Sequence, residues 1–313
     1  MTDPERTALV HLAAGIGDVV LATPLLVALE RLGFTVDVLL DADYAQTAEL
    51  LRGWSVVREV ITGGAREPTA SRGRYLSVIP AVPPFYWRRF RHLYADDSRA
   101  VPRPPDALFY EDAQSYYLAF ARSLGSPAEF RPAYRLPVAP SDEFGVGART
   151  VVLAPGCKGG EMSAKRWPHF SELAELFGDV AVVGTADDLR DARGAALSFP
   201  AGARLFVDRL TLAETASLLA SAGVVVANDS GLAHVAAATG TPTVMIFGPT
   251  PHAALGPLAP NVTIVRAGLP CEPCWFGARL GACGGRVNCL RDVPARVVAR
   301  EVERLLRTQA ASA

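Results

Sequence analysis

The sequence lacks the features that mark membrane-spanning, secreted and nucleic-acid-binding proteins. No uncharged apolar run reaches the ~18 residues that a membrane-spanning helix needs. Residues 1–6 contain no basic stretch leading into an apolar segment of the kind that signals secretion. The formal net charge is −1, so there is no overall basic field to hold nucleic acid. We expect a cytoplasmic protein that binds no nucleic acid, with peripheral contact to the inner face of a membrane left open.

Cysteine is scarce, and most of it is confined to one stretch near the end of the chain. Of five cysteines, Cys157 stands alone and four are crowded together: Cys271, Cys274, Cys283 and Cys289. In a cytosolic protein such crowding argues for metal before disulfides. Four thiolates suit zinc, iron or an iron–sulfur cluster, although the later spacings fit no single metal signature. We expect a structural Zn or Fe site, with four free thiols as the alternative.

The chain is long enough for two domains. It has 313 residues, half of them hydrophobic. Strand-like and helix-like segments alternate in each half, which predicts parallel sheets with right-handed crossovers. Expected strands lie at residues 7–12, 35–40, 56–61, 151–153, 180–183, 224–227 and 243–247, and expected helices include residues 18–32, 44–51 and 112–124. A proline-spaced stretch at 131–141 reads as the linker between the halves.

These segments predict an α/β fold of two Rossmann-like parallel-sheet domains that face each other across a cleft. The first domain covers residues 1–135 and the second residues 145–292, including a cysteine-rich loop at 268–292. A C-terminal helix follows at 293–313. In such folds, ligands bind at the carboxyl ends of the strands.

The first strand runs into the tight turn Gly15-Ile16-Gly17-Asp18. The turn is a poor match to a nicotinamide-binding loop, because the third glycine of that pattern would fall at Val20. Asp18 opens the following helix. It could stabilise the helix N-terminus by ~0.3–1 kcal/mol, or it could act as a general base that removes a proton from an attacking hydroxyl. Spacing alone leaves both roles open.

A second strand-to-helix turn, in the second half, has the composition of a phosphate site. Asp229, Ser230 and Gly231 follow a buried strand and precede a helix that carries His234. Gly231 lets a ligand approach the backbone, and the first helical N–H groups would face it. Asp229 could accept hydrogen bonds from sugar or ribose hydroxyls. The alternative is that Asp229 or Ser230 only caps the helix, and that His234 is a core residue.

Two further loops should converge on this turn if the sheet is parallel. One carries Lys165 and Arg166 and the other Asp188, while Gly248 and Thr250 follow the strand at 243–247. The cations could neutralise a diphosphate, or they could be solvated charge. Asp188 could bind a ribose, or it could cap the following helix. Gly248 could let a ligand approach, although Gly-Pro is also ordinary turn chemistry.

Taken together, these segments resemble glycosyltransferase family 9, the ADP-heptose:lipopolysaccharide heptosyltransferase-like proteins. The resemblance is carried by four motifs: Gly15-Ile16-Gly17-Asp18-Val19 with Thr23-Pro24, Ala164-Lys165-Arg166-Trp167-Pro168, Asp229-Ser230-Gly231-Leu232-Ala233-His234, and Phe247-Gly248-Pro249-Thr250. Residues from about 63 to 145 carry no matching motif.

The resemblance implies a GT-B architecture and an inverting glycosyltransferase. Its donor would be a nucleotide-diphosphate sugar, usually ADP-heptose, and its acceptor a glycan or glycolipid such as the lipopolysaccharide core. Catalysis would need no cofactor, because a lysine and a helix terminus replace the metal. Some relatives are thought to hold iron with C-terminal cysteines.

The resemblance also assigns roles to individual residues. Asp18 would be the general base, in a loop with Gly15 and Gly17 near the acceptor. Donor binding would involve Lys165 and Ser230-Gly231 at the diphosphate, Asp229 at the sugar and Asp188 near the ribose, with His234, Gly248 and Thr250 in the same site.

Three alternatives remain open. An arginine- and aromatic-rich stretch at residues 86–92 could meet an anionic acceptor, although a solvated face over buried aromatics is the favoured interpretation. The protein could instead be a GT-B-like nucleotide-sugar epimerase, which would need no acceptor. It could also be a non-catalytic protein that binds nucleotide sugar or metal.

Overall fold

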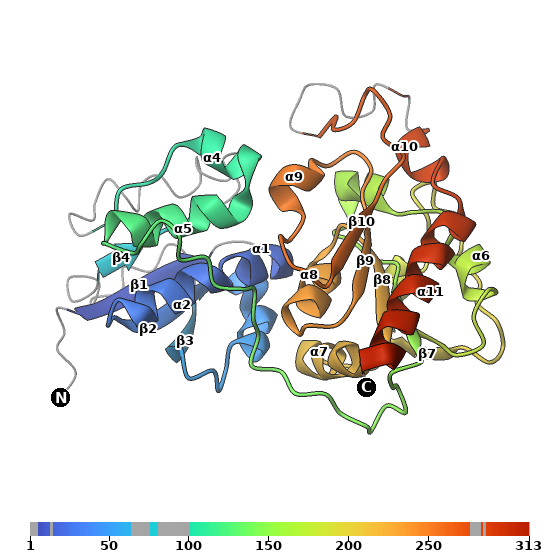
Figure 1. Cartoon of the computed structure of the whole chain (residues 1–313), viewed down its shortest axis with the longest axis horizontal. Helices are drawn as coiled ribbons and strands as arrows, with labels where there is room; N and C mark the ends of the chain where they lie inside the picture. The colour runs from blue at the N-terminus through green and yellow to red at the C-terminus, as the bar shows by residue number, and fades with distance from the viewer. Residues whose placement is uncertain are drawn as a thin grey trace. The chain divides into compact units, whose positions relative to one another are not determined.

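The computed structural model describes residues 6–12, 15–63, 76–80, 100–275, 283 and 286–312 (Figure 1). The arginine- and aromatic-rich stretch at 86–92 lies outside these ranges. The chain divides into two compact units, Met1–Pro137 and Val138–Ala313. None of the helices in the described ranges is long and apolar enough to cross a bilayer.

The first unit is built on a parallel sheet whose strands follow the order β3-β2-β1-β4. Its elements are β1 (Thr7–Leu12), α1 (Ile16–Leu21), α2 (Thr23–Arg31), β2 (Thr35–Asp41), the 3₁₀ segment η2 (Ala42–Leu50), β3 (Val57–Gly63), β4 (Leu76–Val78), α4 (Asp106–Glu111) and α5 (Ala113–Ser123). Strand β1 is buried along its whole length, as expected for a central parallel strand. The predicted parallel sheet is confirmed here.

The single helix predicted over residues 18–32 is wrong, because the chain forms α1 and α2 there. Pro24 lies in the first turn of α2, where its missing N–H is tolerated. The Thr23 hydroxyl donates to the carbonyl oxygen of Val20 at 2.7 Å, which satisfies an acceptor at the break. The helix predicted at 44–51 is found as the 3₁₀ segment η2, which ends at Leu50 and is kinked at Tyr44, whose backbone is not helical.

Helix α5 matches the predicted span and anchors the aromatic core of the first unit. Asp112 caps it by accepting hydrogen bonds from the backbone N–H groups of Gln114 and Ser115. Its buried face carries Tyr116 and Tyr117 and packs against α1, α2 and α4. This packing fixes the short helix α1, and α1 carries Asp18.

The second unit contains a parallel sheet in the order β7-β6-β5-β8-β9-β10. Its elements are β5 (Val151–Ala154), η4 (Gly160–Lys165), α6 (Phe170–Ala174), β6 (Val180–Gly184), η5 (Ala186–Asp188), β7 (Arg204–Val207), α7 (Leu212–Ser221), β8 (Val224–Asn228), α8 (Gly231–Ala238), β9 (Thr243–Ile246), α9 (His252–Leu255), β10 (Val262–Val265), α10 (Asn288–Arg291) and α11 (Ala295–Ser312). Within the unit the strand order is 3-2-1-4-5-6, the Rossmann order.

The core of the second unit lies between one face of this sheet and α6 and α11. Successive side chains of a strand point to opposite faces, so alternate residues such as Val151 and Leu153 reach the same cluster as Val298 and Val302 of α11. Trp167 is fully buried in this cluster, and its indole N–H donates to the carbonyl oxygen of Val293 at 2.9 Å. In Figure 1, α11 runs along the sheet beside β8 and β9, with which it makes contact.

Candidate functional site

The strand order of the second unit reverses between β5 and β8. The chain moves outward from β5 to β6 and β7, then returns to the other side of β5 through β8, β9 and β10. The loops after β5 and β8 therefore diverge at their carboxyl ends, where open α/β sheets bind ligands. The loop after β5 contains residues 155–166, and β8 leads directly to Asp229 and α8.

Asp229 is the centre of a charged cluster at this reversal point. Lys165 Nζ lies 3.1 Å from Asp229 Oδ2, and the Thr250 hydroxyl donates to the same oxygen at 2.7 Å. His234 Nε2 lies 3.9 Å from Oδ1. These partners come from three elements: the end of η4, the loop after β9, and α8. The topology thus gathers three of the candidate donor-site residues around the carboxylate of a fourth.

The surroundings of Asp229 keep it ionised despite its burial. Burial alone would raise the pKa of this carboxyl, whose residue is only 3% exposed. The Lys165 ammonium, His234 and the Thr250 hydroxyl outweigh that effect and hold the pKa well below its usual range. The site therefore presents a fixed anion and a fixed cation side by side. His234 Nδ1 is also buried, and among the described residues it has no hydrogen-bond partner.

Helix α8 begins next to this cluster, and its N-cap residue does not cap it with a side-chain hydrogen bond. Ser230 is the N-cap residue, but its side chain makes no capping hydrogen bond, and the first turn contains no acidic residue. Ser230 therefore does not serve as the side-chain cap that the sequence left open as an alternative. Uncapped N–H groups at Gly231 and beyond, together with the positive end of the helix dipole, form a site suited to phosphate.

Asp188 makes the capping interaction that sequence reasoning named as its alternative. Its Oδ2 accepts hydrogen bonds from the backbone N–H and the hydroxyl of Thr185, both at 2.9 Å. Its carboxylate also lies against Gly156 in the loop after β5, where an added Cβ would come within 2.3 Å of it. A bond from Asp188 to a ribose remains a prediction.

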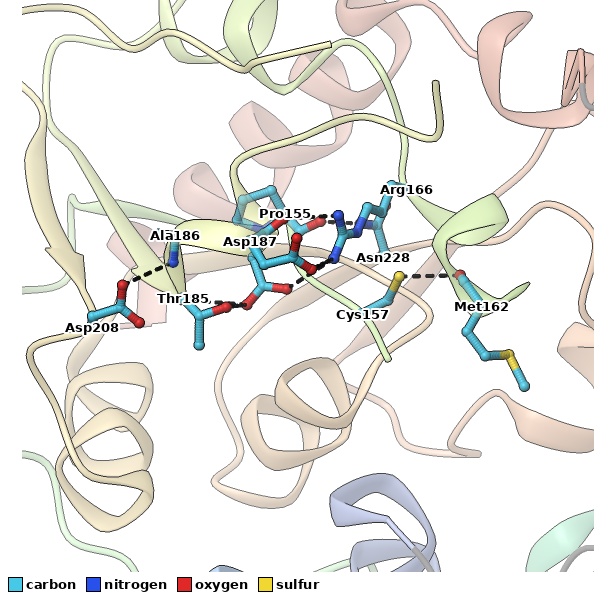
Figure 2. A network of polar contacts seen from close by, with 10 residues as sticks. Pro155, Cys157, Met162, Arg166, Thr185, Ala186, Asp187, Asp208 and Asn228 are labelled. Carbon is cyan, nitrogen blue, oxygen red and sulfur yellow. Dashed lines mark hydrogen bonds and ion pairs between the residues drawn. The ribbon is translucent and has the colours of Figure 1, made fainter. Parts of the chain in front are cut away.

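Arg166 ties the loop after β5 to the loop after β6 (Figure 2). Its buried guanidinium donates to the carbonyl oxygen and to the carboxylate of Asp187, both at 2.8 Å, and lies 3.5 Å from the Asp188 carboxylate. This ion pair lowers the pKa of Asp187. Arg166 is thus a structural cation, whereas the neighbouring Lys165 faces Asp229.

Gly248 has a packing role in the structure. A Cβ at this position would lie 2.7 Å from the Leu290 side chain and 3.1 Å from Cys289 Sγ. The small residue at the end of β9 therefore makes room for α10. Whether it also lets a ligand approach remains a prediction.

The four clustered cysteines form no disulfide and lie within electrostatic reach of one another. Burial raises the pKa of Cys274 and, to about 12, that of Cys289, and negative charge on the other clustered cysteines and on Glu272 raises both further. In the part of the chain that the structure describes, no three His, Cys, Asp or Glu side chains form a metal-binding group. The predicted metal tetrad is not formed in the structure.

Asp18 lies in the first turn of α1 and is half-buried. The N-cap residue of α1 is Gly15, and the Asp18 carboxylate lies near it, 3.9 Å from where a Cβ on Gly15 would stand. The Tyr117 hydroxyl donates to the backbone carbonyl oxygen of Asp18 at 3.2 Å. Burial raises the pKa of Tyr117 well above its usual value, and the charge of Asp18 raises it further. A role for Asp18 as a base remains a prediction.

Two positioning residues were missed from the sequence. One is Tyr117, which no local motif distinguishes from other core aromatics. The other is Asn228, which is fully buried at the end of β8. Its Oδ1 accepts from the Trp167 N–H at 3.0 Å and its Nδ2 donates to the Pro155 carbonyl at 2.5 Å. Asn228 could have been identified from the sequence, because it is a polar residue at the end of an otherwise apolar strand.

Comparison with known proteins agrees with this geometry. A model of glycosyltransferase family 9 (heptosyltransferase) matches residues 110–278, more than half of the chain. The lipooligosaccharide heptosyltransferase 2 of Haemophilus influenzae is 36% identical over 132 residues, 39% of this chain. That match spans only 38% of the Haemophilus protein. The family match includes the Lys165 and Asp229 regions but not Asp18.

Solved structures are similar over nearly the whole chain. The Escherichia coli ADP-heptose lipopolysaccharide heptosyltransferase II superposes with a TM-score of 0.71 at 22% identity, covering 97% of this chain and 99% of that one. The dodecameric iron-containing heptosyltransferase TibC, from enterotoxigenic E. coli, gives a TM-score of 0.65 at 17% identity, covering 98% and 77%.

These likenesses show the fold, so the predicted GT-B architecture with its two Rossmann-like parallel-sheet domains is confirmed. Fold, family model and motif positions agree with one another. The chain belongs to glycosyltransferase family 9, the heptosyltransferase family.

Proposed function

We propose that this protein is an inverting glycosyltransferase that moves heptose from ADP-heptose to a hydroxyl of a glycan acceptor such as the lipopolysaccharide core. The observation that carries the proposal is the pairing of Lys165 and Asp229 beside the uncapped N-terminus of α8. The donor is suggested by the similar E. coli protein, which is named an ADP-heptose heptosyltransferase, and by TibC, whose structure holds an ADP-heptose.

The donor diphosphate would bind at the N-terminus of α8. Amide N–H groups at Ser230-Gly231 and the Lys165 ammonium would face the oxygens that gain charge when the bond to the sugar breaks. Donors fixed where charge develops are worth about 3–4 kcal/mol each in such sites. Asp229 would then accept hydrogen bonds from hydroxyls of the donor sugar, and its lowered pKa suits that role because an ionised carboxylate only accepts.

Asp18 would serve as the general base. An acceptor hydroxyl would attack the anomeric carbon from the side opposite the diphosphate, and its proton would pass to the Asp18 carboxylate. The bond between the anomeric carbon and the diphosphate oxygen would break at the same time, which inverts the configuration. The fixed cation and amide groups supply the charge stabilisation of this step, so the proposed chemistry needs no catalytic cofactor.

The cysteines support a structural metal as part of the proposal. Cys271 and Cys274 have the spacing of a chelating pair, and burial together with nearby negative charge raises the pKa of Cys274 and Cys289. A bound zinc or iron ion would reverse that effect, because it stabilises thiolates. The similar TibC is described as iron-containing. The cysteines would hold the ion as a structural centre outside the reaction.

The acceptor class also suggests where the protein works. A glycolipid acceptor would place this protein in the cytoplasm at the inner face of a membrane, held there by its substrate.

The test is turnover and donor binding by Asp18→Asn. With ADP-heptose and a heptose-free lipopolysaccharide acceptor, we expect ADP affinity within about twofold of wild type. Turnover should fall ~10²- to 10⁴-fold, the usual contribution of a general base. Glu59→Gln, an exposed acid on β3 of the same unit, is the control and should leave both unchanged.

Product analysis separates transfer from other chemistry. A new glycosidic bond in the product supports transfer, whereas release of free sugar in the presence of acceptor points to an epimerase or hydrolase. Full turnover by Asp18→Asn would contradict the assignment of the base.

A further inference from the structure

The segment that carries the first two clustered cysteines is hydrogen-bonded to the loop after β9. The backbone N–H groups of Cys274 and Trp275 both donate to the carbonyl oxygen of Pro249, at 2.9 and 2.8 Å. A carbonyl that accepts two such bonds has both of its lone pairs used, so its direction is fixed. The position of Pro249 therefore depends on residues 271–275.

The residue after Pro249 holds the donor-site carboxylate. Thr250 is only 3% exposed, and its hydroxyl donates to Asp229 Oδ2, the same oxygen that faces Lys165. A continuous series of contacts thus runs from the cysteine segment through Pro249 and Thr250 to Asp229. Hydrogen bonds of 2.7–2.9 Å form its two ends, and Pro249 and Thr250 are joined by the peptide bond.

The cysteine segment is itself anchored, by Glu272. Its carboxylate accepts hydrogen bonds from the backbone N–H groups of Gly268 and Leu269, at 3.2 and 3.1 Å, and pairs with Arg266 at 3.6 Å. The Glu272 side chain is almost fully buried. A buried carboxylate that closes a turn in this way makes the turn rigid, so the segment can transmit its position to Pro249.

We propose that residues 271–275, anchored by Glu272, are a positioning element for the donor site, and that they act on Asp229 through Pro249 and Thr250. The inference rests on the proposed function, because it takes Asp229 and Lys165 to bind a nucleoside diphosphate sugar. Whatever changes this segment, including a ligand or a modification on Cys271 or Cys274, then changes nucleotide affinity. Bound nucleotide, by fixing Asp229 and Thr250, should in turn restrict this segment and slow the reaction of its thiols.

The experiment is a double-mutant cycle of Glu272→Ala and Thr250→Val, with the dissociation constant of ADP measured by calorimetry. Each single variant should weaken ADP binding roughly tenfold. The double variant should be weakened no further than Thr250→Val alone, because both act through one series of contacts. Thr250→Ser, which keeps the hydroxyl, should restore binding to within about threefold of wild type.

Thr241→Val is the matched control. Thr241 is a buried threonine of the same unit, in the loop that precedes β9. Its hydroxyl donates to the carbonyl oxygen of Leu219, in α7, at 2.9 Å. This variant loses a comparable hydrogen bond away from Asp229, so its ADP affinity should match wild type. Thermal unfolding of all variants without ligand gives a second cycle, in which Glu272→Ala and Thr250→Val should again be non-additive.

A third readout uses the thiols. Alkylation of Cys271 and Cys274 by iodoacetamide, followed by mass spectrometry, should slow at least threefold when ADP saturates the wild-type protein and should not slow in Thr250→Val at saturating ADP.

The positioning role would be overturned if the losses of ADP affinity and of thermal stability were both additive. It would also be overturned if ADP left the alkylation rates of Cys271 and Cys274 unchanged. A wild-type protein that binds no ADP would overturn the proposed function and the nucleotide part of this inference together. In that case the unfolding cycle still decides whether the segment positions Asp229.

Discussion

Substituting methionine for Lys165 should destabilise the second unit more than any loss of surface charge. Lys165 and Asp229 have side chains only 12% and 5% exposed, so their pairing lies out of water. Lys165→Met keeps most of the aliphatic side chain but removes the cation. The Asp229 carboxylate is then left buried with the Thr250 hydroxyl and the His234 ring as its remaining partners.

The size of the effect follows from the unpaired charge. Removing one partner of a buried ion pair costs about 3–5 kcal/mol. The remaining hydroxyl and imidazole lessen the loss here, so we expect about 2–3 kcal/mol for Lys165→Met. A unit of 150–250 residues loses ~2–4 °C per kcal/mol, which corresponds to a fall in Tm of roughly 4–12 °C. Asp229→Asn should cost less, because the partly exposed lysine can turn toward water.

The pH dependence tests the cause of the loss. In the wild-type protein the pKa of Asp229 is lowered, so its stabilising contribution is present above the unfolded pKa of ~3.9 and is lost only as pH falls through the folded pKa. In Lys165→Met, burial dominates and the pKa of Asp229 should rise above the unfolded value. The folded variant then takes up a proton first as pH falls, so its deficit should shrink between pH 7 and about pH 4.5.

Thermal and urea unfolding of the ligand-free variants, followed by circular dichroism across this pH range, measures the effect. Lys165→Met/Asp229→Asn should be less destabilised than the sum of the single variants. If Lys165→Met matched wild type at pH 7, or if its deficit were independent of pH, the ion pair would not exist in the free protein. Asp229 would then not hold the Lys165 side chain in place in the absence of a ligand.

Two further substitutions probe contacts next to the proposed chemistry. Tyr117→Phe removes the hydroxyl that donates to the Asp18 carbonyl, so kcat should fall about three- to tenfold with the donor KM unchanged; equal changes in both constants would contradict a role limited to Asp18. Gly156→Ala places a Cβ within 2.3 Å of the Asp188 carboxylate and should expel it, weakening ADP binding roughly tenfold in calorimetry. Unchanged affinity would separate Asp188 from the nucleotide.

The sequence was most informative where a buried strand ends in chemically distinctive residues. Strand β8 is a run of apolar residues that closes with Asn228 and leads into Asp229, and parallel strands bring their carboxyl ends to one edge. The expected parallel sheet therefore predicted that the loop with Lys165 would lie near Asp229, whereas Thr250 was assigned to the same site only through the family resemblance.

Elements whose formation depends on tertiary contacts were not predicted. Strands β7 and β10 are short and only partly buried, at the two edges of the sheet, so they lack the apolar run of a central strand. The break at Ala22 between α1 and α2 depends on Thr23 and Pro24, whose signal is local and was read only as part of a motif.

Individual side-chain roles were harder to predict than their neighbourhoods. Asp188 and Asp187 are adjacent acids after β6, and sequence spacing cannot say that the first folds back on Thr185 while the second meets Arg166. That choice depends on the buried position of Arg166, which its neighbour Trp167 fixes by entering the core. The chemical type of a residue and its position in a loop thus predict where a site lies. Its hydrogen-bond partner, in contrast, depends on how other parts of the domain pack.

The charge balance of the proposed donor site explains why a carboxylate and an ammonium lie side by side. Without Asp229, the buried Lys165 ammonium would face the positive end of the α8 dipole with no compensating anion, and Asp229 relieves that repulsion. In the proposed function, an entering diphosphate would supply the compensating anion, and the N–H donors of the Lys165 ammonium would turn from the carboxylate to the phosphate oxygens. The lone pairs of Asp229 would then be available to sugar hydroxyls. The ion pair would therefore open as the donor binds, which would make sugar recognition depend on prior binding of the diphosphate.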